Sequence, residues 1–177
     1  GCALLYASLE LDGLKVKDPE KLAYVTQTTL SVDETRDVIT ALRKRFPSII
    51  GPDLKDICYA TQNRQDAVRE LAPKVDLLLV VGAKYSSNSN RLCDLGASIG
   101  VESYLIASAD DLVPTWLDNV KNIGITAGAS APEDLVQGVI SRLGDFGEVE
   151  VTSLPGVEEN ITFKLPKKLL KSASAAA

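Results

Sequence analysis

Histidine and methionine are both absent from this chain of 177 residues. Without histidine, the commonest general base and the commonest metal ligand are unavailable. This absence excludes a histidine-based catalytic centre built by the chain alone. A chain that holds no methionine and opens at Gly1 is also expected to be a piece of a longer polypeptide.

A surplus of positive charge is missing as well. The 19 Lys and Arg residues are outnumbered by 24 Asp and Glu residues, which gives a net charge of −5. This balance argues against a nucleic-acid surface. No apolar run reaches the roughly 20 residues that a membrane span needs, and no signal peptide opens the sequence. We therefore expect a cytoplasmic protein with neither nucleic acid nor membrane as a partner.

Cysteine is scarce, with three residues at positions 2, 58 and 93. They form no CxxC pair and no zinc spacing, so neither a disulfide framework nor a zinc site is expected. Cys93, beside Leu92 on a predicted helix, is interpreted as a small core residue. Cys58 precedes a helix, whose N-terminus would favour its thiolate. Core filler, nucleophile and metal thiolate all remain open for Cys58, and a metal would need ligands from outside this chain.

Strands alternate with amphipathic helices along the chain, which predicts a doubly wound α/β fold with a parallel sheet. The continuous apolar run at 75–82 is typical of a strand that is covered on both faces. Further strands are expected at 22–27, 101–108, 122–128, 148–154 and 159–166. Helices are expected at 32–46, from about 58 to 71, from about 88 to 99, at 110–117 with a break at Pro114, and from about 133 to 143.

This pattern divides the chain into three parts. Residues 1–54 form a partial α/β unit, and residues 55–146 form a complete α/β unit that carries Cys58. Residues 147–177 form extended segments followed by a low-complexity tail. The predicted fold class is thus α/β, with one complete and one partial parallel-sheet unit.

Four of the predicted helices begin after clusters of hydroxyl and amide side chains. In a parallel sheet such turns lie at the carboxyl ends of strands, where ligands bind, and helix N-termini attract anions. The sequence therefore predicts a phosphate or diphosphate held by neutral donors. The clusters are Thr28/Thr29/Ser31, Thr61/Asn63, Ser86/Ser87/Asn88 and Ser130.

Helix capping is the alternative interpretation of each cluster. Ser31-x-x-Glu34 and Ser130-x-x-Glu133 both read as capping boxes. The run "SSNSNR" is harder to explain this way, because one cap needs one side chain and five polar residues stand together here. Neither GxGxxG nor a Walker-type phosphate loop is present.

Five ordered segments resemble one known family. They are "YVTQTTLS", "DICYATQNRQ", "VGAKYSSNSNRL", "GITAGASAP" and "EENITFKLP". Together they are similar to the C-terminal half of the IspH/LytB family of 4-hydroxy-3-methylbut-2-enyl diphosphate reductases, from about residue 20 to 168. The resemblance implies three α/β units around a four-iron, four-sulfur (4Fe–4S) cluster, and a bacterial, cytoplasmic enzyme.

The implied reaction is the reductive dehydroxylation of the substrate to isopentenyl and dimethylallyl diphosphates, with ferredoxin or flavodoxin as electron donor. Cys58 matches the third cluster cysteine, and Thr28 matches a threonine near the substrate hydroxyl that is part of a proton relay. The residues that match the diphosphate grip are Ser86, Ser87, Asn88 and Ser130.

The cluster's other two cysteines, and the histidines and the glutamate of the family site, belong to the family's N-terminal half and are absent from this sequence. The chain alone is therefore expected to be inactive. Two alternatives stay open: a non-catalytic α/β module that binds a phosphorylated small molecule, and a truncated remnant without function.

Overall fold

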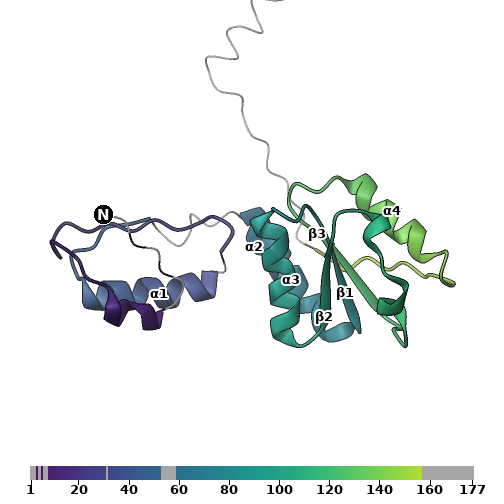
Figure 1. The fold of residues 1–177 in the computed structure, drawn as a ribbon, viewed down its shortest axis with the longest axis horizontal. Coiled ribbons are helices and arrows are strands. Elements are labelled where there is room, and N and C mark those ends of the chain that lie inside the picture. The colour runs from purple at the N-terminus through teal and green to yellow at the C-terminus, as the bar shows by residue number, and fades with distance from the viewer. Residues whose placement is uncertain (1–2, 4, 6–7, 31, 53–58, 157–177) are drawn as a thin grey trace, which may run out of the picture.

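The computed structural model of the protein describes residues 3, 5, 8–30, 32–52 and 59–156. Two parts are visible in Figure 1: a smaller N-terminal part that contains helix α1 (Val32–Arg45), and a larger α/β unit that contains the sheet. Among the described residues, no helix is both long enough and apolar enough to cross a bilayer.

The α/β unit is built on three parallel strands in the order β2–β1–β3. Helices α2 and α3 lie on one side of this sheet and α4 lies on the other (Figure 1). This arrangement confirms the predicted α/β class with a parallel sheet. The bounds are Tyr59–Leu71 for α2, Leu77–Val81 for β1, Ser87–Ile99 for α3, Glu102–Ile106 for β2, Ile123–Ala127 for β3 and Glu133–Leu143 for α4.

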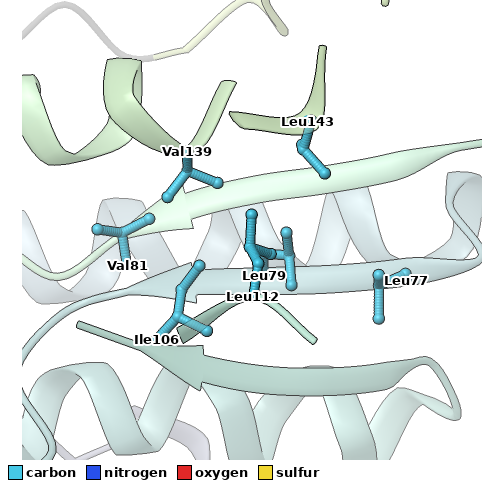
Figure 2. Close-up of a cluster of buried hydrophobic side chains, with 7 residues drawn as sticks. All are labelled: Leu77, Leu79, Val81, Ile106, Leu112, Val139 and Leu143. Carbon is cyan, nitrogen blue, oxygen red and sulfur yellow. The ribbon is translucent and has the colours of Figure 1, made fainter. Parts of the chain in front are cut away.

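Strand β1 is the centre of the core, since all five of its residues are buried. Successive side chains of a strand point to opposite faces, so each face of the sheet receives a different set. Leu77, Leu79 and Val81 face α4 and pack with its Val139 and Leu143, as Figure 2 shows. The continuous apolar run in the sequence therefore predicted this strand correctly.

The opposite face of β1 packs against α2 and α3. Leu78 and Val80 contact Val68 of α2 and Leu92 of α3 there. Helix α3 then ends at Gly100, whose φ of 101° is a left-handed conformation that glycine adopts without strain. The chain can in this way turn directly from α3 into β2.

The connection from β2 to β3 contains two 3-10 helices in place of the single short helix that was predicted. They span Ala109–Asp111 and Pro114–Leu117. Proline has no backbone N–H and fixes its φ angle, so Pro114 begins the second turn and cannot continue the first. The second turn places Trp116 in a parallel stack on Tyr104, with 3.8 Å between the ring centroids.

The strand predicted at 22–27 is wrong. Only one isolated parallel bridge forms there, between Ala23 and Ile50. Its two hydrogen bonds run from Tyr24 N–H to the Ile50 carbonyl and from Ile50 N–H to the Leu22 carbonyl. A longer strand needs a longer partner, and Val25, just past the bridge, is 90% exposed.

The predicted strand at 148–154 is also wrong, because residues 148–156 are exposed and form no strand among the described residues. An alternating sequence becomes a strand only where a neighbouring backbone pairs with it. The segment predicted at 159–166 lies outside the described residues.

The helix predicted at 32–46 is confirmed as α1, and its Leu42 packs with Phe46 and Leu11 in a small separate core.

Candidate anion-binding site at the carboxyl edge of the sheet

The carboxyl ends of all three strands open on one shallow depression of about 280 Å³. Gly82 follows β1, Ala107 follows β2, and the turn after β3 leads to Ser130 and Pro132. The predicted site residues Ser86 and Ser130 both line this depression, although they lie 44 positions apart in the sequence. The full lining is Gly82, Ala83, Tyr85, Ser86, Ala107, Ser130, Ala131, Pro132 and Leu135.

A larger depression, about 400 Å³, lies at the opposite, amino edge of the sheet. Its charged lining residue is Asp76, which accepts hydrogen bonds from the backbone N–H groups of Asn122 and Lys121. These two donors lower the pKa of Asp76, so the side chain stays ionised. A fixed negative charge disfavours an anion there, and the smaller depression is the better candidate for an anion site.

Ser86 is the N-cap of α3, and its side chain accepts a hydrogen bond from the backbone N–H of Ser89. The first-turn N–H groups of a helix have no intrahelical acceptor, and the helix dipole makes this end positive. Asn90 fixes the turn, because its amide nitrogen donates to the carbonyls of Lys84 and Ser86. The capping role that the sequence left open is therefore filled by Ser86.

The side chain of Asn88, by contrast, makes none of these capping hydrogen bonds. Its side chain is 7% exposed, and neither its amide nitrogen nor its amide oxygen has a hydrogen-bond partner among the described residues. The position that a Cβ atom would occupy on Gly128 lies 3.8 Å from Asn88 Nδ2, so the amide lies beside the turn after β3. Buried polar groups are rarely left unpaired. The Asn88 amide is therefore a polar group at this edge whose hydrogen-bonding capacity is open, although it is not part of the lining of the depression.

Ser130 is exposed, and it does not cap α4. The N-cap position is Pro132, which makes no side-chain cap, and the helix begins at Glu133. The capping box predicted for Ser130 and Glu133 is therefore wrong. The N-cap proline lies two residues after Ser130 and the helix starts three residues after it, so the serine stays in the preceding turn. The Ser130 hydroxyl is thus at the depression and outside the helix.

The remaining predicted site residues are not gathered at this depression. Ser87 is exposed on the first turn of α3. Thr28 is exposed in a turn whose next residue, Thr29, accepts a weak 3.4 Å hydrogen bond through its carbonyl from Gln65 of α2. Cys58 lies outside the described residues, and so does Ser31 with its predicted capping box.

Metal ligands are not clustered in the part of the chain that the structure describes. No group of three or more His, Cys, Asp or Glu side chains there could hold a metal ion. The described residues therefore do not fit an iron–sulfur cluster by themselves, and Cys58 could contribute one thiolate only. A 4Fe–4S cluster with an open iron takes three thiolates, so a single cysteine does not suffice.

Cys93 is partly buried, as predicted, and packs against the α2–α3 side of the core. Its thiol donates a 3.3 Å hydrogen bond to the Ser103 carbonyl. Burial raises the pKa of this thiol, and the neighbouring Asp94 carboxylate raises it further.

Because the thiolate is the reactive form, we expect iodoacetamide to alkylate Cys93 more slowly at pH 8 in the folded chain than in urea. Peptide mass spectrometry would measure both rates, and equal rates would contradict this environment.

Three residues at this edge were not predicted from the sequence: Gly82, Ser89 and Gly128. Ser89 is 1% exposed, and its Oγ lies 2.2 Å from where a Cβ atom would stand on either Gly82 or Gly128. The available signal was a glycine directly after each apolar strand, in "VVG" and "ITAG". Such a glycine can mark a close backbone approach.

The sequence of this chain is similar to proteins of one known family. The profile of the family described as LytB protein matches residues 3–144. A curated relative from Serratia proteamaculans, named 4-hydroxy-3-methylbut-2-enyl diphosphate reductase, is 62% identical over 156 residues, which are 88% of this chain and 49% of the relative. A relative of the same name from Tolumonas auensis is 55% identical over 96% of this chain and 54% of its own length.

A solved structure agrees with these sequence matches. The E-1-hydroxy-2-methyl-but-2-enyl-4-diphosphate reductase from Plasmodium falciparum superimposes with a TM-score of 0.82 at 32% identity, over 97% of this chain and 55% of that one. The chain thus spans about half the length of the curated relatives it matches.

Proposed function

Because this chain belongs to the LytB protein family, we propose that it supplies the diphosphate-binding half of a 4-hydroxy-3-methylbut-2-enyl diphosphate reductase. The observation that carries this proposal is the depression at the carboxyl edge of the sheet, which brings Ser86 and Ser130 together. The buried amide of Asn88, which has no hydrogen-bond partner among the described residues, lies next to Gly128 at the same edge, outside the lining of the depression. An unpaired amide of this kind costs stability unless a ligand completes it. The position of the depression at the N-terminus of α3 favours an anion as that ligand.

In this proposal the diphosphate is held by neutral donors. We assign donation to phosphate oxygens to the hydroxyls of Ser86 and Ser130, which line the depression. We assign the same role to the Ser87 hydroxyl and the Asn88 amide nitrogen, which lie on the first turn of α3 outside that lining. Hydrogen bonds to charged groups are stronger than those between neutral partners. The first turn of α4 carries Glu133 and Asp134, so the favourable field comes chiefly from the N-terminus of α3, which has no acidic residue in its first turn.

The proposed reaction removes the allylic hydroxyl of the substrate as water and requires two electrons and two protons. It yields isopentenyl or dimethylallyl diphosphate. A 4Fe–4S cluster would supply the electron-transfer chemistry, with Cys58 as one of three ligands and the other two outside this sequence. We assign the electrons to a ferredoxin or flavodoxin. The Thr28 hydroxyl, which lies in an exposed turn, would hold a proton for the departing oxygen.

Two further assignments belong to this proposal. The relatives described above include bacterial reductases, which supports a bacterial, cytoplasmic protein. We also propose the division of the chain at residues 54/55 and 146/147. It separates a partial α/β unit from the complete unit that carries the diphosphate grip and from the C-terminal segment.

Replacing Asn88 with alanine tests the proposed grip. We expect the affinity for inorganic diphosphate to fall about tenfold, since a hydrogen bond to a charged group contributes about 1.5–3 kcal/mol. The melting temperature without ligand should stay the same or rise, because the change removes a buried amide that has no described partner. Isothermal titration calorimetry and thermal melting of the complete polypeptide would measure the two effects.

Gln137→Ala is the matched control. Gln137 is exposed on α4, and its amide donates to Glu133, so its loss should leave diphosphate binding unchanged. If Asn88→Ala kept full affinity for diphosphate, the amide would have another purpose and the proposed grip would be wrong.

A further inference from the structure

Ser89 is the third residue of α3 and is almost completely buried, with 1% of its surface exposed. Its hydroxyl lies between the two residues that follow β1 and β3. A Cβ atom on Gly82 would stand 2.2 Å from Ser89 Oγ, and so would one on Gly128. Contacts this short do not occur in folded proteins, so both strand ends must be glycine for the hydroxyl to fit between them.

Two hydrogen bonds of Ser89 lead to the Ser86 hydroxyl. The Ser89 hydroxyl donates to Ser86 Oγ at 3.0 Å, and the Ser89 backbone N–H donates to the same oxygen at 3.3 Å. A serine hydroxyl has two acceptor positions and one proton to donate. Both acceptor positions of Ser86 are therefore filled from within the helix, and its own proton is left to donate.

Ser86 lines the depression at the carboxyl edge, so this proton is available to a ligand there. Ionised phosphate oxygens accept hydrogen bonds, and a hydroxyl held as a donor suits them. Two hydroxyls in series also polarise each other, which strengthens the outer bond. Because Ser89 is buried between two glycines, its hydroxyl has a fixed position. The series of hydrogen bonds from Ser89 through Ser86 to the ligand starts at that hydroxyl.

We propose that Ser89 is a positioning residue for diphosphate binding. Through its buried hydroxyl it holds Ser86 as a hydrogen-bond donor toward the anion and does not touch the anion itself. This inference rests on the proposed function and names a residue that determines how well the site binds. Ser89 acts on affinity through Ser86 alone.

A double-mutant cycle on the complete polypeptide tests this dependence, with inorganic diphosphate as the probe in isothermal titration calorimetry. Ser89→Ala is expected to weaken binding about fivefold, the effect of losing one hydrogen bond of ordinary strength. Ser86→Ala should weaken binding by at least as much. The double variant should bind no more weakly than Ser86→Ala, because Ser89 acts only through the hydroxyl that is already missing.

Ser98→Ala is the matched control on the same helix. The Ser98 hydroxyl is exposed near the C-terminus of α3 and donates to the Leu95 carbonyl, so its removal should not change diphosphate affinity. Thermal melting of every variant checks that affinity is compared between folded proteins. Ser89→Ala removes a single oxygen atom and is expected to fold.

Three results would overturn the inference in distinguishable ways. Unchanged affinity in Ser89→Ala would show that the buried hydroxyl does not matter for binding. Independent, multiplicative losses in the double variant would show that Ser89 acts by packing and not through Ser86. If the unmodified protein bound no diphosphate, the proposed function would fail together with this inference, whereas the first two results leave the proposed function intact.

Discussion

Replacing Cys58 with alanine in the complete polypeptide is expected to remove the proposed iron–sulfur cluster and abolish the proposed reductase activity. The physical reason is that three thiolates are needed to hold a 4Fe–4S cluster that leaves one iron open, and the loss of one breaks the set. Iron and sulfide content, visible absorbance and turnover of anaerobically purified protein would measure this effect.

Cys93→Ala is the control for the cysteine prediction. Cys93 is partly buried, its thiol donates a hydrogen bond to the Ser103 carbonyl, and burial raises the pKa of the thiol. Its replacement should leave the cluster in place. A Cys58→Ala protein with full cluster content would contradict the proposed ligand role. If the unmodified protein were colourless yet bound diphosphate, the non-catalytic phosphate-binding module would become the better account.

Replacing Gly128 with alanine is the second change with a large expected effect. The new methyl group would stand 2.2 Å from Ser89 Oγ, so the helix terminus or the turn after β3 must move. Overpacking of this kind costs about 1–3 kcal/mol of stability. We expect diphosphate affinity to fall about a hundredfold, because Ser86 and Asn88 are displaced together and each bond to a charged group contributes about 1.5–3 kcal/mol.

Gly138→Ala is a control that is expected to change the stability in the opposite direction. Gly138 lies in the middle of α4, and no atom lies within 4 Å of the position a Cβ atom would take. Alanine is the better helix former, so this change should raise stability by up to about 1 kcal/mol. Denaturant unfolding would measure both variants. A Gly128→Ala protein with unchanged stability and affinity would show that the two turns are not held against Ser89 as described.

The sequence predicted the strands and the main helices between residues 59 and 143 well because these elements carry strong local signals. Strand β1 is apolar at every position and buried at every position. Helix α3 starts with a serine cap and ends at a glycine that adopts a left-handed conformation. These signals come from residues that are close in sequence. They can therefore be recognised without knowing which other segment of the chain packs against the element.

The failed strand predictions depended on partners that the sequence does not identify. Residues 22–27 and 148–154 have strand-like patterns, yet the first forms a single bridge to Ile50 and the second forms no strand. Strand formation requires a neighbouring backbone, and residue pattern alone does not show whether one is present. The capping box at Ser130 failed for a local reason, because Pro132 occupies the N-cap position.

The candidate site was only partly predictable. The hydroxyl turns could be placed at one edge of the sheet, because the strands were expected to be parallel. The contact of Ser89 with both Gly82 and Gly128 joins residues 39 positions apart and depends on the order of the strands. The unpaired state of the Asn88 amide depends on its burial, which a polar run such as "SSNSNR" does not indicate.

The most direct test of the account is an anaerobic turnover assay of the complete native polypeptide with 4-hydroxy-3-methylbut-2-enyl diphosphate and a chemical one-electron reductant. The account predicts that isopentenyl and dimethylallyl diphosphates form and that inorganic diphosphate inhibits competitively. If the protein binds inorganic diphosphate but forms neither product, the site is a phosphate-binding module and the proposed reductase function is wrong.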